Sequence, residues 1–205
     1  MVALVTGAAV GIGRAIALAL LANGMDTWLA DVQEPEGPEG RFVAVDVTDG
    51  AALRRLIGDA TPDVLVNNAG GIPAGRSEVE ILDLNLRSAV VDTTLAVEHG
   101  ARSIVNIASV AGIETSPHRS PAYAAAKAGL IRFTTALKTP PGVRINCIVV
   151  GWIRTERAVE ELRAMTASER AAAPPTIAME DVADAVVRLV EDNALNHHVL
   201  VLSAT

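Results

Sequence analysis

The sequence predicts an α/β fold: a doubly wound parallel sheet of about seven strands flanked by helices. Half of its 205 residues are apolar, only 2% are aromatic, and short apolar runs alternate with longer segments of helical periodicity. Cores made of Ala, Val, Leu and Ile are typical of helices packed on a parallel sheet, whose strands are buried on both faces. The length fits one domain spanning residues 1–205.

The first half of the chain alternates strands and helices. Val2–Thr6 is an apolar run followed by a glycine, and the apolar residues of Ile12–Leu20 recur at helical spacing, which predicts strand, turn and helix. A second buried run, Thr27–Ala30, precedes Glu34–Gly40, whose prolines and glycines exclude a helix. The next strand, helix and strand are predicted at Phe42–Val45, Ala51–Asp59 and Val64–Val66.

The second half continues this alternation. Glu78–His99 is the longest helical stretch in the sequence. The remaining predicted strands are Ser103–Ala108, Val143–Val149 and His198–Leu202, and the remaining helices are Ala122–Leu137 and Asp181–Glu191. Right-handed crossovers between such elements give a parallel sheet. The segment 155–175 is rich in Ala and charged residues, so it suits a substrate lid and equally a plain surface helix.

Composition makes several classes of partner unexpected. A net charge of −7 leaves no basic stripe for nucleic acid or an anionic membrane, so neither is expected to bind. Glycines and Arg14 interrupt the apolar N-terminus, so it reads neither as a membrane span nor as a signal segment, and a cytoplasmic location is expected. The lone Cys147 excludes an internal disulfide, and the histidines lack metal-ligand spacing, so no metal is expected.

Three glycines between the first strand and the first helix indicate a phosphate-binding turn. Gly7, Gly11 and Gly13 follow the strand directly and open the helix. Glycine lets backbone N–H groups approach a pyrophosphate at the positive end of the helix. This context, strand before and helix after, is the dinucleotide-binding arrangement of a Rossmann-type sheet.

Two aspartates at strand ends bear on the choice of cofactor. Asp31 ends the second strand, where a carboxylate accepts hydrogen bonds from the ribose hydroxyls of NAD and repels the 2′-phosphate of NADP. The predicted cofactor is therefore NAD, although Asp31 would also serve as a cap of the loop after it. Asp46 has two equally weighted interpretations, a cap of the following helix or a contact to the adenine amino group.

Tyr123 and Lys127 form the first candidate catalytic pair. They stand four residues apart in a helical segment, so both side chains project from one face. An ammonium group beside a phenol favours the phenolate and suits it to general acid/base work. On spacing alone such a pair is more often part of a solvated helix face.

Two further polar residues shift that balance toward catalysis. Ser109 ends the fifth predicted strand, where its hydroxyl could bind a substrate carbonyl oxygen. Asn85 lies inside the long helical stretch, although Asn is a poor helix former. It is interpreted either as an exposed or capping residue or as a polar group that holds a water for proton relay.

These residues together resemble the short-chain dehydrogenase/reductase family, in its ordinary single-domain type. The matching positions lie in family order along nearly the whole chain, and any one of them alone would be weak. They are Thr6, Gly7, Gly11, Gly13, Asp46, Val47, Thr48, Asn67, Asn68, Ala69, Gly70, Asn85, Ser109, Tyr123, Lys127 and the segment Gly151–Thr155.

The resemblance implies specific roles. Tyr123 would be the acid/base, Lys127 would bind the nicotinamide ribose and tune Tyr123, Ser109 would orient the substrate, and Asn85 would support a water relay. Val10 stands where NADP-dependent members often carry a basic residue, which agrees with NAD. The cofactor-binding residues expected from the motifs and the resemblance are Gly7, Gly11, Ile12, Gly13, Asp31, Asp46, Val47, Asn67, Ala69, Gly70, Tyr123, Lys127, Ile153 and Thr155.

The chain is thus expected to be an NAD-dependent oxidoreductase that interconverts a secondary alcohol and a ketone. Its expected partner is this small-molecule substrate, the alcohol or the ketone. The alternative is an NAD(H)-binding sensor or scaffold without turnover. Family habit also implies a homo-oligomer, a dimer or tetramer, paired through Glu78–His99 and Ala122–Leu137. Two departures from the family pattern are the loop that replaces a helix after Asp31 and Val150 in place of a proline before Gly151.

Overall fold

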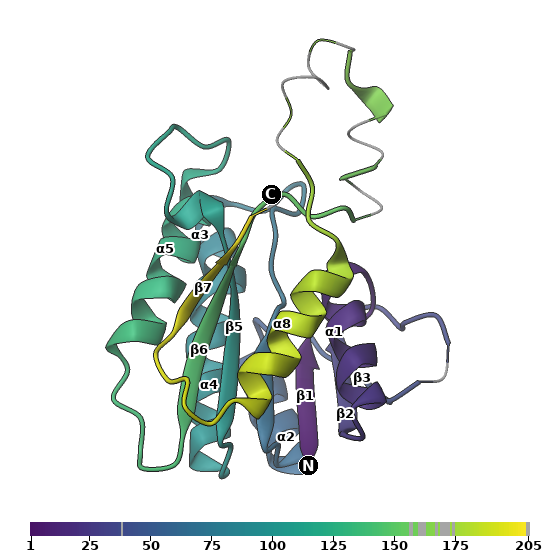
Figure 1. The fold of residues 1–205 in the computed structure, drawn as a ribbon, viewed down its shortest axis with the longest axis vertical. Helices are drawn as coiled ribbons and strands as arrows, with labels where there is room; N and C mark the ends of the chain where they lie inside the picture. The colour runs from purple at the N-terminus through teal and green to yellow at the C-terminus, as the bar shows by residue number, and fades with distance from the viewer. Residues whose placement is uncertain are drawn as a thin grey trace.

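The computed structural model describes residues 1–37, 39–155, 158–159, 163–166, 168, 173 and 175–203. In this part of the chain a seven-stranded sheet has the order β3-β2-β1-β4-β5-β6-β7, with every pair of neighbours parallel (Figure 1). The predicted doubly wound parallel α/β fold is confirmed. The strands are β1 (Val2–Thr6), β2 (Asp26–Asp31), β3 (Arg41–Ala44), β4 (Val64–Asn67), β5 (Ser103–Ser109), β6 (Arg144–Val150) and β7 (Val199–Leu202).

Helices cover both faces of the sheet. α1 (Gly11–Ala22) and α8 (Met179–Glu191) lie on the face nearest the viewer in Figure 1, and α2 (Gly50–Ala60), α4 (Ser88–Glu98) and α5 (Pro121–Ala136) lie on the other. The strand order reverses between β1 and β4, because β2 and β3 lie on one side of β1 and the later strands on the other. Ligands bind beyond the carboxyl ends of strands at such a switch point.

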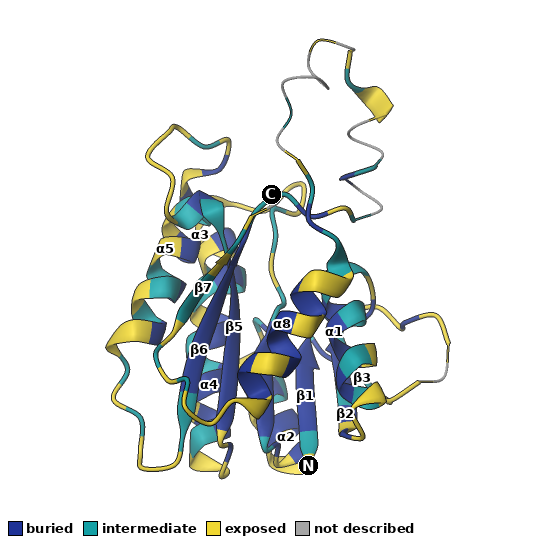
Figure 2. Cartoon of the chain, viewed as in Figure 1, coloured by how far each residue is buried: buried dark blue, intermediate teal, exposed yellow. Residues whose placement is uncertain are grey.

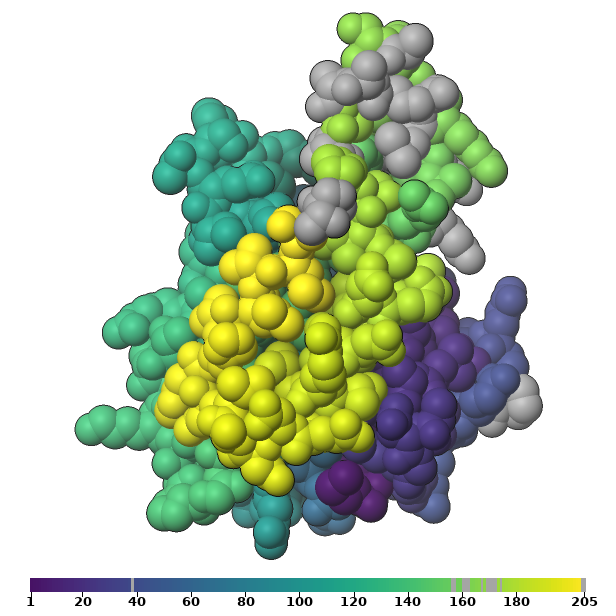
Figure 3. Space-filling model, in the orientation of Figure 1, coloured from purple at the N-terminus to yellow at the C-terminus, as the bar shows by residue number. Residues whose placement is uncertain are grey.

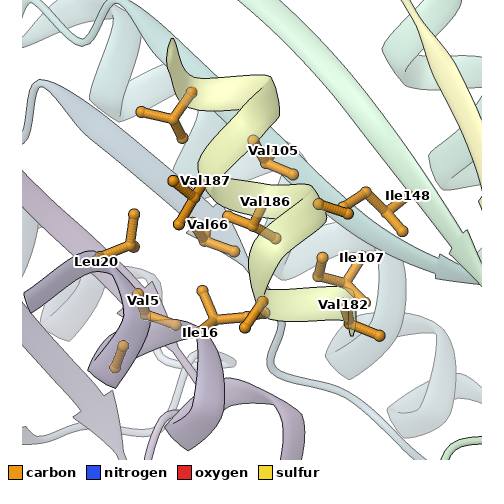
Figure 4. Close-up of a cluster of buried hydrophobic side chains, with 14 of the residues drawn as sticks. Val5, Ile16, Leu20, Val66, Val105, Ile107, Ile148, Val182, Val186 and Val187 are labelled. Carbon is orange, nitrogen blue, oxygen red and sulfur yellow. The ribbon is translucent and has the colours of Figure 1, made fainter. Parts of the chain in front are cut away.

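The hydrophobic cluster between α1, α8 and the sheet contains no aromatic residue among the described residues. Figure 4 shows Ile16 and Leu20 of α1 together with Val186 of α8, beside Val5 and Val66 of the strands. All five side chains are fully buried, and Figure 2 shows the same dark inner surface along α8 and the central strands. Burial on both faces explains why the strands read as continuous apolar runs.

The predicted helix Glu78–His99 is not regular. It consists of α3 (Glu78–Leu82), a π-helical turn over Asp83–Arg87, and α4. Asn85 sits in this turn, and its Nδ2 donates to the carbonyl oxygen of Ile81, four residues earlier (2.9 Å). A π turn carries one more residue than an α turn and is frequently found at functional sites.

The connection after β2 is a loop, as predicted. Residues 32–37 and 39–40 contain no helix, and β3 follows at Arg41. The predicted lid, 155–175, falls largely outside the described residues. Within the described residues, the structure contains no helix whose length and apolar character would let it cross a membrane.

Asp92 of α4 is a buried carboxyl group on the α4/α5 side of the sheet. It is 2% exposed, and its Oδ1 has no hydrogen bond to any described residue. Burial penalises the charged form and raises the pKa of Asp92 to about 8 from 3.8. Ionisation of Asp92 therefore destabilises the folded state, because the unfolded chain loses this proton near pH 4.

Asp92→Asn should remove this cost. Wild-type stability should fall relative to that of the variant as the pH rises from about 4 to 8, by up to about 1.4 kcal/mol per pH unit. Urea denaturation at pH 4, 6 and 8 measures the difference in free energy of unfolding. Asp59→Asn, at an exposed position of α2, is the control and should show no such trend. A constant difference across this range for Asp92→Asn would contradict the prediction.

Candidate active site

A cleft of about 540 Å³ opens where the carboxyl ends of β1, β2, β4 and β5 meet. It brings together most of the site residues predicted from the sequence. Those that line it are Gly7, Ile12, Gly13, Asp31, Asp46, Val47, Ala69, Gly70, Tyr123, Lys127 and Thr155.

The glycine turn forms one wall of the cleft. Gly7 and Gly11 have φ values of +64° and +58°, the left-handed region that favours glycine. A methyl group on Gly13 would overlap the carbonyl oxygen of Gly7 and the amide of Asn68. Val10, the N-cap of α1, has an apolar side chain that makes no capping hydrogen bond to the first amides of the helix. An uncapped helix start beside close-packed glycines fits a pyrophosphate.

Asn68 and Thr6 fix this turn to the neighbouring strand. Both belong to the family pattern, but this structural role was not predicted for either of them. Asn68 Nδ2 donates to the carbonyl oxygens of Thr6 (3.0 Å) and Gly7 (2.9 Å). Thr6 Oγ1 accepts from the backbone N–H groups of Asn68 and Ala69, both at 3.1 Å. The Asn67-Asn68 pair could have indicated this role. Successive side chains of a strand point to opposite faces, so one of the two amides had to face the glycine turn.

The two aspartates are held differently. Asp31 Oδ2 accepts from the N–H of Ala9 (2.9 Å) and Oδ1 from the N–H of Gln33 (3.1 Å), so its carboxylate ties the glycine turn to the loop after β2. Asp46 Oδ1 accepts from the N–H and the hydroxyl of Thr48, and these bonds lower the pKa of Asp46. The helix-cap interpretation of Asp46 is wrong, because Asp49 caps α2.

Tyr123 and Lys127 lie one turn apart on α5, at the far wall of the cleft. Lys127 Nζ lies 5.6 Å from the centre of the Tyr123 ring and donates to the carbonyl oxygen of Ile107 (2.9 Å). Lys127 is only 4% exposed, so the pair is not a solvated helix face. Burial lowers the pKa of Lys127 to about 8, with Cys147 acting in the opposite direction. His118 stacks on the Tyr123 ring, with centroids 5.7 Å apart.

Asn85 supports the floor of the cleft through the backbone. Its Oδ1 accepts from the N–H of Gly71 (2.7 Å), and its Nδ2 donates to the carbonyl oxygen of the same residue (2.8 Å). A methyl group on Gly70 would lie 2.6 Å from Asn85 Oδ1 and 3.3 Å from Lys127 Nζ. Glycine at position 70 therefore lets the backbone pass between these two side chains.

Comparisons with known proteins agree with this geometry. A family model described as short chain dehydrogenase matches residues 1–166. Rat (Rattus norvegicus) 15-hydroxyprostaglandin dehydrogenase (NAD(+)) is 30% identical over 249 positions, which cover 100% of this chain and 91% of that protein.

Two solved structures are similar over 98% of this chain, each with a TM-score of 0.83 and 26% identity. They are the ligand-free aldohexose dehydrogenase of Thermoplasma acidophilum, of which 91% is covered, and an actinorhodin polyketide ketoreductase variant with NADPH, of which 95% is covered. This chain belongs to the short-chain dehydrogenase family. The resemblance inferred from the motifs is confirmed, and with it an oxidoreductase fold that takes a nicotinamide cofactor.

Several residues predicted from the short-chain dehydrogenase pattern do not line the cleft in this structure. Asn67 is buried beneath it, where its Nδ2 donates to Asn106 Oδ1 (2.8 Å) and Thr93 Oγ1 (3.0 Å). Ser109 Oγ accepts from the N–H of Ala111 (3.3 Å) and so caps the short 3₁₀ turn after β5. Ile153 is buried and bridges to Ile177. Their roles toward ligands stay predictions.

Gly13→Ala should disrupt the glycine turn, because the added methyl group has no room beside Gly7. Overlap with backbone is relieved only by shifting the turn, so we expect a loss of about 1–3 kcal/mol in the free energy of unfolding. Urea denaturation measures this loss, and NADH titration should show weaker binding.

Gly58→Ala is the matched control. Gly58 lies in the last turn of α2, and among the described residues a methyl group there would meet His99 Nε2 at 3.8 Å, an ordinary van der Waals contact. This substitution should stabilise the protein or leave it unchanged, since Gly is unfavourable inside helices by roughly 0.5–1 kcal/mol. Equal effects of the two substitutions would show that the turn tolerates a side chain.

Proposed function

We propose that this chain is an NAD-dependent oxidoreductase that interconverts a secondary alcohol and a ketone by hydride transfer. The observation that carries the proposal is the shared cleft. Gly7 and Gly13 of the glycine turn, Asp31 and the Tyr123–Lys127 pair all line it, although they come from three separate regions of the chain. A bound nicotinamide would supply the acceptor or donor of the hydride. The protein must then supply binding, orientation and a proton.

Tyr123 is proposed to hold and move that proton at its phenolic oxygen. The buried cation of Lys127, 5.6 Å from the ring centre, favours negative charge on the phenol. Lys127 Nζ is oriented by the carbonyl oxygen of Ile107, which fixes the ammonium group beside the ring. Its remaining N–H donors suit the ribose hydroxyls of the cofactor. Ser109, at the end of β5, is proposed to orient the substrate oxygen, and Asn85 to support proton relay.

Asp31 supports NAD over NADP. Both cofactors occur among the relatives, since the prostaglandin dehydrogenase is named for NAD(+) and the ketoreductase structure holds NADPH. Asp31 stands at the end of β2 in the cleft, and its oxygens already orient the backbone of Ala9 and Gln33. A carboxylate there accepts from ribose hydroxyls and repels a 2′-phosphate.

The remaining properties follow from the family. The partner is proposed to be a small alcohol or ketone, and the assembly a homo-oligomer, a dimer or tetramer, paired through α4 and α5. A cytoplasmic location is part of the same proposal. The apolar wall of the cleft, which includes Leu84, Ala108 and Val150, suits a largely apolar substrate and cofactor ring.

Tyr123→Phe tests the acid/base assignment. The variant keeps the aromatic ring but lacks the phenolic hydroxyl that would exchange the proton, so turnover of secondary alcohols should fall by about 10²–10⁴-fold. NADH binding, followed by fluorescence, reports whether the cleft is intact and should persist. Turnover at the wild-type rate would refute the role of Tyr123. Binding of NADH by wild-type protein without turnover on any alcohol or ketone would refute the proposed reaction.

Asp31→Asn tests the cofactor preference. Asparagine keeps an oxygen for the N–H of Ala9 but removes the charge that opposes a 2′-phosphate. The ratio of the NADPH Kd to the NADH Kd should fall by about tenfold, roughly 1.4 kcal/mol. An unchanged ratio in fluorescence titrations would reduce Asp31 to a brace of the glycine turn.

A further inference from the structure

Arg14 of α1 is held by the loop that replaces a helix after β2. Its guanidinium group donates to the Glu39 carboxylate (2.6 Å) and to the backbone carbonyl oxygens of Glu36 (2.9 Å) and Glu39 (3.4 Å). The Arg14 side chain is 15% exposed, whereas that of Glu39 is 53% exposed. Figure 1 shows this loop beside α1, and Figure 3 shows both on the same side of the molecule.

The conformation of this loop allows the Glu39 carboxylate to reach Arg14. Gly37 has a φ of +90°, and a methyl group there would lie 2.6 Å from Glu39 Oε2. Glycine thus leaves room for the Glu39 carboxylate to fold back onto Arg14. Hydrogen bonds from its own backbone and from Arg14 lower the pKa of Glu39, so it is ionised at neutral pH.

Arg14 lies next to the place where a cofactor ribose would meet Asp31. A groove of about 720 Å³ runs along α1 and contains Arg14 together with Val10 and Gln33. Val10 also lines the main cleft, and the backbone N–H of Gln33 donates a hydrogen bond to Asp31. Among the described residues that line this groove, Arg14 is the single cation, and the acidic residues are Glu34, Glu36, Glu180 and Asp184.

We propose that the Arg14–Glu39 ion pair is a second determinant of cofactor choice, which withholds Arg14 from the 2′-phosphate of NADP. The inference rests on the proposed nicotinamide-dependent function. A guanidinium group is the preferred protein partner of a phosphate, because its fork matches two oxygens. Here the fork is already used by a carboxylate and two carbonyls, and the Glu39 charge cancels its field. Asp31 repels the 2′-phosphate, and Glu39 removes the cation that would compensate.

Glu39→Gln tests this inference. The neutral amide should release the Arg14 charge toward the groove, and the NADPH-to-NADH ratio of Kd values should fall by about fivefold. Glu34→Gln is the matched control, since it removes the same charge from the same loop without touching Arg14. Its ratio should change by less than about twofold. Fluorescence titrations with NADH and NADPH on all variants give these ratios.

The double variant Arg14→Gln with Glu39→Gln makes the test specific, because without Arg14 the gain should vanish. An equal effect of Glu34→Gln and Glu39→Gln, or a gain that persists without Arg14, would overturn the inference. So would an unchanged ratio in Glu39→Gln when the wild-type protein prefers NADH. Wild-type protein without such a preference would instead refute the proposed NAD dependence, and wild-type protein that binds neither cofactor would refute both.

Discussion

The side chain of Asn68 joins the carboxyl ends of β1 and β4, the two strands between which the sheet reverses its order. Its amide donates hydrogen bonds to the carbonyl oxygens of Thr6 and Gly7. In the opposite direction, the Thr6 hydroxyl accepts hydrogen bonds from the backbone N–H groups of Asn68 and Ala69, which follow β4. The glycine turn, the floor at Gly70 and the start of α1 all depend on this junction. These contacts therefore hold the shape of the cleft where the two strands end.

Buried polar groups position α5 on the sheet. Asn67 and Asn106 are paired in the β4–β5 register and hydrogen-bonded to each other. Asn106 Nδ2 also donates a hydrogen bond to Thr134 Oγ1 of α5 (2.9 Å). Glu78 of α3 accepts from the N–H of Ala122, at the start of the same helix (3.0 Å). These contacts fix the rotation and height of α5, so Lys127 is buried with a carbonyl partner. An amine buried at this cost to stability is better explained by chemistry than by packing.

The sequence was sufficient for the fold because its signals are local. Apolar runs, helical spacing and the proline-glycine loop after β2 identify the elements, and glycine spacing identifies the turn. The directions in which side chains point at strand ends were harder to predict from the sequence. Asn67 turns into the core while Asn68 faces the cleft, and Ser109 caps a turn, because each depends on where a strand stops. The packing of Arg14 against Glu39 joins residues distant in sequence, and no local pattern reveals such a contact.

The π turn at Asp83–Arg87 limits how this chain can change in length over evolution. The turn holds one residue more than an α turn, so deleting one residue here would restore a regular helix while α3 and α4 keep their mutual orientation. Glu78 would keep its contact with Ala122, but Asn85, which lies in the turn itself, would lose its position beside Gly71. Insertions and deletions should be tolerated better in the surface loop after β2 than in this turn, because a loop takes up added residues without displacing a helix.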